Sequence, residues 1–448
     1  MLFVFIRFSR RMRDISILNT RKGIPIASDR TPKLINIADR TQDNLDSAKL
    51  KIAIYSHDTK GLGHMRRNLL ISGKISSSFS NSSVLLITGS REINRFRIPE
   101  GVDCLTLPSY YKESDDNYKS RSLKVSLDEI VTLRSSIIKE TLKSYSPDLF
   151  IVDYAAKGGL NELNKTLKYL RKYSSTLCVL GLRDILGDPK YVLKEWNRKK
   201  IVDFIDDHYD YVWVYADPGV YNMCEECNLP EQIQSKITFT GYLGHTDLAD
   251  YKEKRNKYLN FDFSSKKIVL CVLGGGQDGI VLADKFAETK IPRGYVGLLL
   301  TGPYMSSKDK DRLRLKINKN PGIKLVEFIP DPIKLFNDAE RIISMGGYNT
   351  VCELLANKKK ALVVPRVNSR REQVLRAEKL SAMGLVDTIL PHELSPEWLN
   401  EWLKKDIACT DSRSQINMDG LSRMPVLIKS IISENMAKQH NYRDVLSL

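Results

Sequence analysis

The chain has 448 residues, of which 42% are hydrophobic and 28% are charged, the balance of a soluble globular protein rather than of a disordered or fibrous one. Its length exceeds the size at which one hydrophobic core usually stops growing, so two domains are expected. No apolar run approaches the roughly 18–20 residues that would cross a bilayer. The apolar stretch at residues 1–6 precedes the first basic residues, the reverse of the order in a secretory signal, so a cytoplasmic location is expected.

The formal net charge is +16, and residues 1–49 contribute ten basic and five acidic residues, a surplus of five. The cations are spread along the chain without an aromatic-rich basic motif, so no nucleic-acid partner is expected. One interpretation is an electrostatic preference for an anionic membrane surface, which would place the protein peripherally at the inner face of the membrane. The other is a basic protein surface without a membrane role.

Residues 1–48 show no periodicity and are predicted to form a poorly ordered basic extension. Short β-branched runs then alternate with helical stretches. The strands predicted in this first part are Lys51–Tyr55, Ser83–Thr88, Asp148–Asp153, Thr176–Leu182 and Tyr209–Ala216. This alternation of strands and helices is interrupted by a charged linker, residues 244–264, and then resumes. The strands predicted in the second part are Lys267–Leu273, Tyr295–Thr301, Ile323–Phe328, Arg341–Ser344, Lys360–Pro365 and Val386–Leu390.

Mostly apolar strands that alternate with helices indicate parallel sheets covered on both faces. We therefore predict an α/β protein with two Rossmann-like, doubly wound domains, residues 49–243 and 265–448, the second including the C-terminal helices. Ligands of such sheets bind beyond the carboxyl ends of the strands, so the chemistry should face the cleft between the domains.

The first loop at such a strand end contains Gly61 and Gly63 and leads into a predicted helix over Met65–Ile75. Glycines permit close backbone approach, and a helix N-terminus attracts negative charge. His64 stands where the helix begins, and a histidine there can accept a proton from a substrate hydroxyl. The alternative is a capping or loop histidine, and His57 is a second candidate base.

A second loop follows Lys267–Leu273, where Gly274, Gly276 and Gly279 fit the G-x-G-x-x-G dinucleotide fingerprint. The fingerprint also expects an acidic residue at the end of the next strand, and Tyr295–Thr301 ends without one. A nicotinamide or flavin cofactor, and with it an oxidoreductase, is therefore disfavoured. The loop is expected to receive another phosphate or sugar group.

The third loop carries Gly346 and Gly347, and a helix is predicted to begin near Asn349 or Thr350. Its backbone amides, the Thr350 hydroxyl and the helix dipole form an anion site that suits a diphosphate. Glu353 lies one turn further on the same face, where a carboxylate can bridge the two hydroxyls of a ribose. The alternative for Thr350 and Glu353 is an ordinary capping box.

The fourth loop opens a helix with Glu372 and Gln373, whose side chains can hydrogen-bond sugar hydroxyls. The preceding Arg370 and Arg371 offer charge to a phosphate. The alternative is a solvated helix N-terminus of mixed charge.

Taken in order, these segments resemble the MurG-like glycosyltransferases, the family that includes the lipid-linked N-acetylglucosaminyltransferase of peptidoglycan synthesis. The resemblance extends over residues 50–400. It implies a GT-B fold and a UDP-sugar donor such as UDP-N-acetylglucosamine or a related hexose. The donor-binding residues that it implies in the second domain are Gly275, Gly276, Ile329, Gly346, Gly347, Asn349, Thr350, Glu353, Glu372 and Gln373. On the acceptor side, in the first domain, the resemblance places His64, whose glycine loop contains Gly61 and Gly63. Asp153, at the end of a predicted strand, is a further acceptor-side candidate, and the alternative for it is a loop cap.

Within this set, the backbone of Ile329 would recognise the uracil base of the donor. Two positions depart from the family pattern, because Gly276 stands where serine is common and His245 where arginine is frequent. Both departures bear on the identity of the donor more than on the fold.

The predicted reaction is an inverting transfer in which His64 deprotonates the acceptor hydroxyl and the helix N-terminus near Gly347–Thr350 stabilises the departing UDP. No cofactor or metal is expected, and the acceptor is lipid-linked or a small molecule. One alternative is a nucleotide-sugar hydrolase or epimerase on the same fold. A second is a non-catalytic basic protein that binds a membrane surface or RNA.

Overall fold

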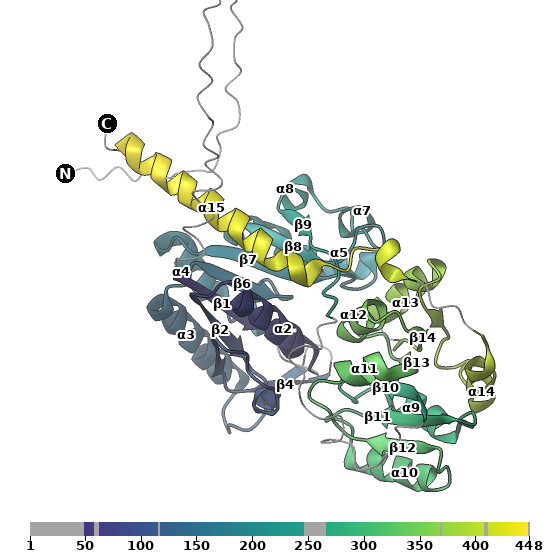
Figure 1. Ribbon diagram of the computed structural model, residues 1–448. Helices are drawn as coiled ribbons and strands as arrows, with labels where there is room; N and C mark the ends of the chain where they lie inside the picture. Colours follow the sequence, from purple (N-terminus) through teal and green to yellow (C-terminus); the bar gives the residue numbers. More distant parts are fainter. Residues whose placement is uncertain are drawn as a thin grey trace, which may run out of the picture.

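The computed structural model describes residues 49–57, 62–114, 117–245, 266–367, 370–406 and 411–446 (Figure 1). The predicted extension, residues 1–48, and the predicted linker from residue 246 onward lie outside the described residues.

The first half contains a parallel seven-stranded sheet with the strand order β3-β2-β1-β6-β7-β8-β9. Its strands are β1 (Leu50–Ser56), β2 (Ser82–Thr88), β3 (Val102–Thr106), β6 (Leu149–Asp153), β7 (Leu177–Arg183), β8 (Tyr211–Tyr215) and β9 (Ile237–Phe239). Its helices are α2 (Gly63–Ser78), α3 (Leu127–Tyr145), α4 (Asn164–Tyr173), α5 (Pro189–Arg198), α6 (Ile201–His208), α7 (Met223–Glu226) and α8 (Glu231–Gln234), with the short turns η1 (Arg91–Arg95) and η2 (Gly159–Asn161).

The second half repeats this plan with a parallel sheet of order β12-β11-β10-β13-β14-β15. Its strands are β10 (Lys267–Val272), β11 (Tyr295–Leu300), β12 (Ile323–Val326), β13 (Ala339–Ser344), β14 (Lys360–Val363) and β15 (Asp387–Thr388). Its helices are α9 (Ile280–Glu288), α10 (Ser307–Asn318), α11 (Ile333–Asp338), α12 (Tyr348–Ala356), α13 (Glu372–Ala382) and α14 (Pro396–Lys404), with the turn η3 (Ser412–Ser414).

Each sheet starts in its middle, extends to one edge and then continues on the other side of its first strand, so the order reverses between β1 and β6 and between β10 and β13. These are the switch points where open α/β sheets bind ligands. Strands β3 and β9 were not predicted. They are edge strands without a fully buried residue, so no continuous apolar run marks them. The antiparallel pair β4 (Tyr110–Ser114) and β5 (Asn117–Ser120) was not predicted either.

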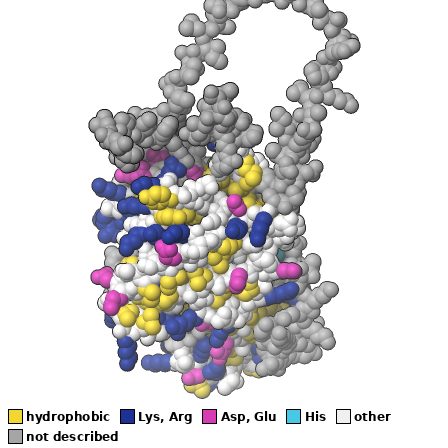
Figure 2. All heavy atoms as spheres, turned by 90° about the vertical axis from the view of Figure 1, so that its left-hand side faces the viewer, with side chains coloured by type: hydrophobic (Ala, Val, Ile, Leu, Met, Phe, Trp, Pro, Cys, Tyr) yellow, Lys and Arg dark blue, Asp and Glu magenta, His cyan; other side chains and the backbone are white. Residues whose placement is uncertain are grey.

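The face turned to the viewer in Figure 2, the left-hand side of Figure 1, interleaves Lys and Arg side chains with hydrophobic ones. The cations are thus spread over this face rather than gathered in one block. Within the described residues, no helix combines the length and apolarity needed to cross a membrane.

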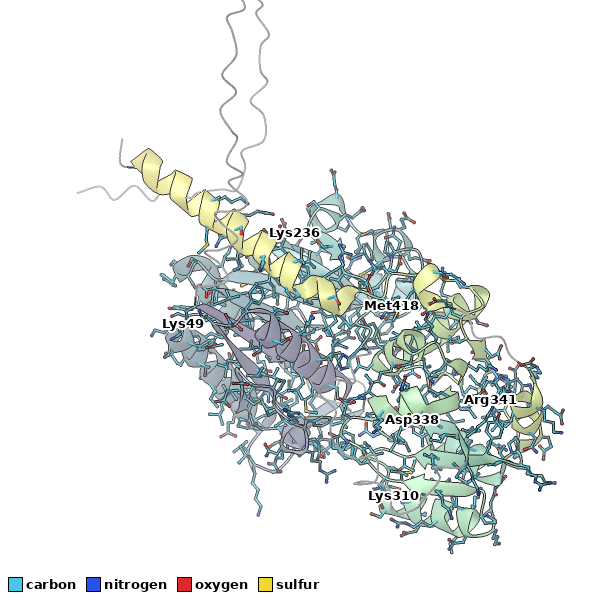
Figure 3. The ribbon with its side chains drawn as sticks, in the orientation of Figure 1. Lys49, Lys236, Lys310, Asp338, Arg341 and Met418 are labelled. Carbon is cyan, nitrogen blue, oxygen red and sulfur yellow. The ribbon has the colours of Figure 1, made fainter. Side chains whose placement is uncertain are left out.

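The last helix, α15 (Gly420–Leu446), returns to the first half and packs on α2 (Figure 1). Met418, labelled in Figure 3, lies just before it, where the chain crosses between the halves. The apolar stripe of α15 includes Met424, Ile428 and Ile432, which are buried in the core shared with the first sheet. This helix was predicted to belong to the second domain, residues 265–448, and that assignment is wrong for its packing, because an apolar stripe does not reveal which surface it covers.

Candidate functional site

A cavity of about 250 Å³ lies between the two halves, beyond the carboxyl ends of both central strands. The first half contributes Gly63, His64, Arg66, Arg67 and Arg183 to its lining. The second half contributes the loop after β10, the segment after β12 and the start of α12. The two walls predicted from the strand ends therefore face one space.

His64 lies in the first turn of α2, and its Nδ1 is 2.6 Å from Oδ2 of Asp153, the last residue of β6. Asp153 is fully buried behind the histidine ring. Its other oxygen accepts hydrogen bonds from Nη2 and Nε of Arg67, at 2.5 and 3.2 Å. Residues 64 and 67 share one face of the helix, so both side chains converge on one carboxylate.

The charges around Asp153 and His64 determine which of the two side chains carries the proton. The Arg67 guanidinium and the His64 ring hold the pKa of Asp153 far below its ordinary value despite burial. An ionised carboxylate only accepts hydrogen bonds, so Nδ1 of His64 carries the proton and Nε2 is left as a base. Burial lowers the pKa of His64 below 6.5, against the influence of Asp153, so the ring is neutral near pH 7.

His57 is the other candidate base, and its ring lies edge-on to the His64 ring with the centroids 5.6 Å apart. Burial, with the neighbouring His64 ring, lowers the pKa of His57 to about 3. A base so weak is poorly matched to proton abstraction near neutral pH. The geometry therefore favours His64 over His57.

On the opposite wall, α12 begins after Gly347, whose backbone is extended and whose added Cβ would meet open space. The first helical bond runs from the Val351 amide to the Gly347 carbonyl, at 2.9 Å. The amides of Tyr348, Asn349 and Thr350 precede it and are the ones a helix leaves for an anion. The capping-box alternative for Thr350 and Glu353 is wrong, because the N-cap is Gly347 and no side chain caps the helix.

Glu353 joins the two walls. Its Oε1 accepts a hydrogen bond of 2.7 Å from Nη2 of Arg66, while its Oε2 is buried without a hydrogen-bond partner. Burial raises the pKa of Glu353, and the Arg66 guanidinium opposes that rise. Beside it, Nδ2 of Asn349 donates to the carbonyl of Gly63 at 2.9 Å. The N-terminus of α12 is thus held directly against the residue that precedes His64.

In the fourth predicted loop, Arg366 holds the side chains of Glu372 and Gln373 in place. Its Nη2 donates to Oε1 of Glu372 at 2.9 Å, and its backbone amide donates to Oε1 of Gln373 at 2.9 Å. Gln373 lines the cavity, whereas Glu372 is buried behind it with Oε2 unpartnered. Sugar binding by these two residues stays a prediction.

The loop after β10 and the segment after β12 also line the cavity, through Gly275, Gly276 and Ile329. Gly276 has a φ of 91°, and an added Cβ would collide with the carbonyl oxygen of Thr301. In this loop conformation a serine would be strained, which gives a physical reason for the departure from the family pattern.

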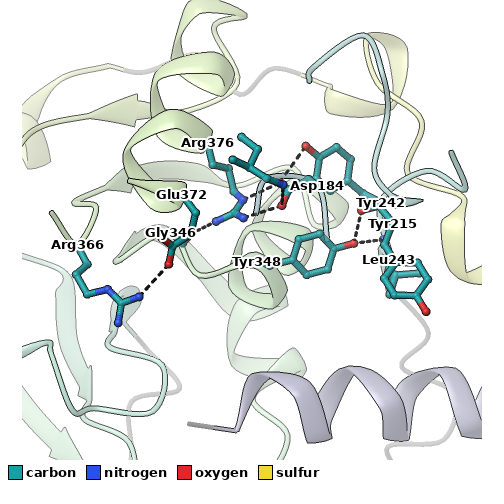
Figure 4. A network of polar contacts seen from close by, with 10 residues as sticks. Asp184, Tyr215, Tyr242, Leu243, Gly346, Tyr348, Arg366, Glu372 and Arg376 are labelled. Carbon is teal, nitrogen blue, oxygen red and sulfur yellow. Dashed lines mark hydrogen bonds and ion pairs between the residues drawn. The ribbon is translucent and has the colours of Figure 1, made fainter. Parts of the chain in front are cut away.

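A buried seam fixes the two walls relative to each other (Figure 4). Nε and Nη2 of Arg376 donate to the two oxygens of Asp184, both at 2.6 Å, and Nη1 donates to the carbonyl of Gly346 at 2.9 Å. The Tyr348 hydroxyl donates to the carbonyl of Tyr215 at 2.7 Å. Gly346 therefore supports the site from behind and does not line the cavity.

The predicted residues thus fall into three groups. Those that line the cavity are Gly63, His64, Gly275, Gly276, Ile329, Gly347, Asn349, Thr350, Glu353 and Gln373. Asp153, Gly346 and Glu372 lie behind this lining, and Gly61 lies outside the described residues. Arg183, Asp184 and Arg376 were not predicted as site residues. The first two follow the apolar run of β7, and that position at a strand end was an available signal.

The sequence contains one Asp-x-Asp triplet, Asp309-Lys310-Asp311, of the kind that can bind a metal. It lies on α10, where Asp311 is paired with Arg314 at 2.7 Å, and neither aspartate lines the cavity. Within the described residues, no cluster of three or more His, Cys, Asp or Glu side chains is arranged to hold a metal ion.

Comparison with known proteins agrees with this architecture. Residues 269–430 match the glycosyltransferase family 28 C-terminal domain. The UDP-N-acetylglucosamine–N-acetylmuramyl-(pentapeptide) pyrophosphoryl-undecaprenol N-acetylglucosamine transferase of Clostridium kluyveri is 29% identical over 146 residues, 32% of this chain and 40% of the relative. The Haemophilus influenzae protein of that name is 24% identical over 212 residues, 44% of this chain and 53% of the relative. The chain therefore spans about half the length of the curated relatives that it matches.

Solved structures show the same fold over nearly their whole length. MurG of Acinetobacter baumannii has a TM-score of 0.52 at 14% identity, covering 85% of this chain and 99% of that one. UDP-GlcNAc 2-epimerase of Neisseria meningitidis bound to UDP-GlcNAc has a TM-score of 0.53 at 14% identity, covering 87% and 100%. The predicted two-domain α/β fold is confirmed. Residues 269–430 match a glycosyltransferase family 28 C-terminal domain, and the chain as a whole has the GT-B fold that it shares with the MurG structure.

Proposed function

We propose that this protein transfers a sugar from a UDP-sugar to an acceptor hydroxyl with inversion at the anomeric carbon. One observation carries the proposal. His64, oriented by Asp153, and the free N-terminus of α12 line opposite walls of one cavity. A proton acceptor and an anion site across a single cavity are what the transfer requires.

The donor belongs to the second half in this proposal. The diphosphate lies at the amides of Tyr348, Asn349 and Thr350, where the helix dipole favours negative charge. The ribose hydroxyls donate to Oε2 of Glu353, which is buried and lacks a protein partner. An unpartnered buried acceptor is costly, and a ribose hydroxyl satisfies it.

The reaction then uses the first half. Nε2 of His64 takes the proton of the acceptor hydroxyl as its oxygen attacks the anomeric carbon from the face opposite UDP. Asp153 stabilises the resulting imidazolium. General-base catalysis of this kind contributes about 10²–10⁴-fold. The charge on departing UDP is stabilised by the N-terminus of α12, so we propose a reaction that needs no metal or cofactor.

An epimerase or hydrolase acting on the same donor is the second candidate, because UDP-GlcNAc 2-epimerases share this fold. Product analysis separates the candidates. A transferase releases UDP in proportion to glycosylated acceptor, a hydrolase releases free sugar at full rate without acceptor, and an epimerase converts the donor without releasing UDP. A non-catalytic membrane or RNA binder predicts binding that does not depend on Glu353.

For the acceptor we propose a lipid-linked hydroxyl compound as the first class to test, with small molecules as the alternative. The curated relatives act, by their names, on a pyrophosphoryl-undecaprenol acceptor. The mixed basic and apolar face in Figure 2 supports peripheral contact with an anionic membrane at its inner face. Co-sedimentation with phosphatidylglycerol vesicles, compared with phosphatidylcholine vesicles, tests this location.

The decisive experiment is ligand binding followed by turnover. UDP at 100 times its Kd should stabilise the native state by about 2.7 kcal/mol, which thermal denaturation detects. UDP-N-acetylglucosamine and related hexose donors are then assayed for UDP release with lipid-linked acceptors. If neither UDP nor any UDP-sugar stabilises the full-length protein, the proposed function is wrong.

A further inference from the structure

Arg183 differs from the other arginines of the cleft. Three other arginines line the cavity, and each faces a carboxylate: Arg66–Glu353 at 2.7 Å, Arg67–Asp153 at 2.5 Å and Arg366–Asp278 at 2.5 Å. Behind the lining, Arg376 pairs with Asp184 at 2.6 Å. Arg183 forms no ion pair with any carboxylate of the described residues, although Glu372 acts on it electrostatically. It is a positive charge in the cavity lining that has no carboxylate of the described residues at ion-pair distance.

The position of Arg183 is defined by its neighbours. It is the last residue of β7, and its guanidinium lies 4.9 Å from the ring centroid of Tyr154. The Tyr154 ring is in turn 5.3 Å from the His64 ring. Arg183 therefore stands on the wall of the first half, one aromatic ring away from the base.

The surroundings of Arg183 disfavour its charge as they stand. Its Nε is buried without a hydrogen-bond partner. Burial, together with the nearby Arg67 and Arg376, lowers the pKa of the guanidinium, and Tyr154 and Glu372 only partly oppose this effect; the group still keeps its proton near neutral pH. An enclosed cation with an unused donor is costly unless a ligand supplies the negative charge. The planar fork of arginine matches a phosphate or a carboxylate in two-point contact.

We propose that Arg183 binds an oxyanion, a phosphate or a carboxylate, that the acceptor carries close to its attacking hydroxyl. This assignment rests on the proposed function. The donor diphosphate has its own site at the N-terminus of α12, whereas Arg183 belongs to the wall that carries His64. The acceptor is therefore an anionic compound, and Arg183 positions it against the base.

The test uses full-length protein saturated with UDP, so that the donor site is occupied. Pyrophosphate and malonate are titrated into this complex by calorimetry, as phosphate-type and carboxylate-type probes. We expect at least one probe to bind the wild type and to bind Arg183→Gln about ten- to a hundredfold more weakly, the usual effect of losing a charged hydrogen-bond partner. Arg183→Lys should show an intermediate loss. Arg312→Gln, which removes an exposed arginine of α10, serves as the charge-matched control and should bind like the wild type.

UDP affinity is measured in each variant, both as a check of folding and to separate this inference from the proposed function. It should stay within about twofold of the wild type, since the α12 site is untouched. The inference is overturned if neither probe binds the UDP complex, or if both bind Arg183→Gln as tightly as the wild type. It is also overturned if UDP affinity falls in Arg183→Gln while its thermal denaturation is unchanged, because the anion would then belong to the donor. Absence of UDP binding in the wild type would instead refute the proposed function.

Discussion

Replacing His64 with alanine is the sharpest test of the proposed chemistry. The structure orients its ring by the 2.6 Å contact between Nδ1 and Asp153 and leaves Nε2 as the only basic nitrogen of the ring. Loss of a positioned base lowers kcat by about two to four orders of magnitude, which is roughly 3–5 kcal/mol of transition-state stabilisation. UDP affinity should stay within about twofold, because the proposed UDP contacts lie on α12.

The wall around residue 64 should survive the substitution. Asp153 keeps both hydrogen bonds from Arg67, and the contact from Asn349 to Gly63 uses a backbone carbonyl that alanine does not disturb. His392→Ala, at an exposed histidine with 72% side-chain exposure, is the matched control and should retain the wild-type rate.

The assay measures UDP release with a saturating UDP-sugar and acceptor, across a pH series, alongside calorimetric UDP binding. The wild-type rate should fall on the acidic side below pH 6.5, since burial lowers the pKa of His64 from that value and a protonated ring cannot accept a proton. His64→Ala should lack this acidic limb. A rate within tenfold of the wild type, or a loss of UDP affinity equal to the loss of rate, would refute the role of His64 as the base.

Further predictions concern the donor, the pH profile, the metal and the stability of the fold. Glu353→Ala should weaken UDP binding about ten- to a hundredfold but leave 2′,3′-dideoxy-UDP binding unchanged in calorimetry. Equal losses of affinity for both ligands would contradict the proposed contact between Glu353 and the ribose hydroxyls. Asp153→Asn should lower kcat and move the acidic limb to lower pH, since it removes the negative charge that raises the pKa of His64; a limb at higher pH contradicts this arrangement. Turnover should persist in EDTA, and complete loss restored by Mn²⁺ would show that a metal holds the diphosphate. Arg376→Ala should lower the free energy of unfolding by about 3–5 kcal/mol in urea, because it leaves a buried carboxylate unpaired. Lys379→Ala, which breaks an exposed ion pair between the halves, should cost less than about 1 kcal/mol, and equal losses would contradict the role of the buried seam.

Much of this architecture could be predicted from local sequence. Apolar runs buried on both faces of a parallel sheet are continuous, so all eleven predicted strands appear, within a few residues of their predicted ends. Since the carboxyl ends of parallel strands share one edge, the loops with Gly63, Gly276 and Gly347 were expected to meet, and they line one cavity. Strands β3 and β9 were not predicted, because partial exposure interrupts their apolar pattern. The packing of α15 on the first half was not predicted either, because an apolar stripe does not show which surface it covers.

Only the tertiary structure decided which side chains pair. Arg66 and Arg67 are adjacent in sequence, but a helix turns about 100° per residue, so they point to different partners. Arg66 crosses to Glu353, 287 residues away, whereas Arg67 turns inward to Asp153. The sequence by itself determined two doubly wound sheets and the loops that border the cleft, because strand and helix periodicities are local properties. The contact of His64 with Asp153, the absence of an ion pair at Arg183 among the described residues, and the contact of α12 with Gly63 depend on distances between segments that no local pattern encodes.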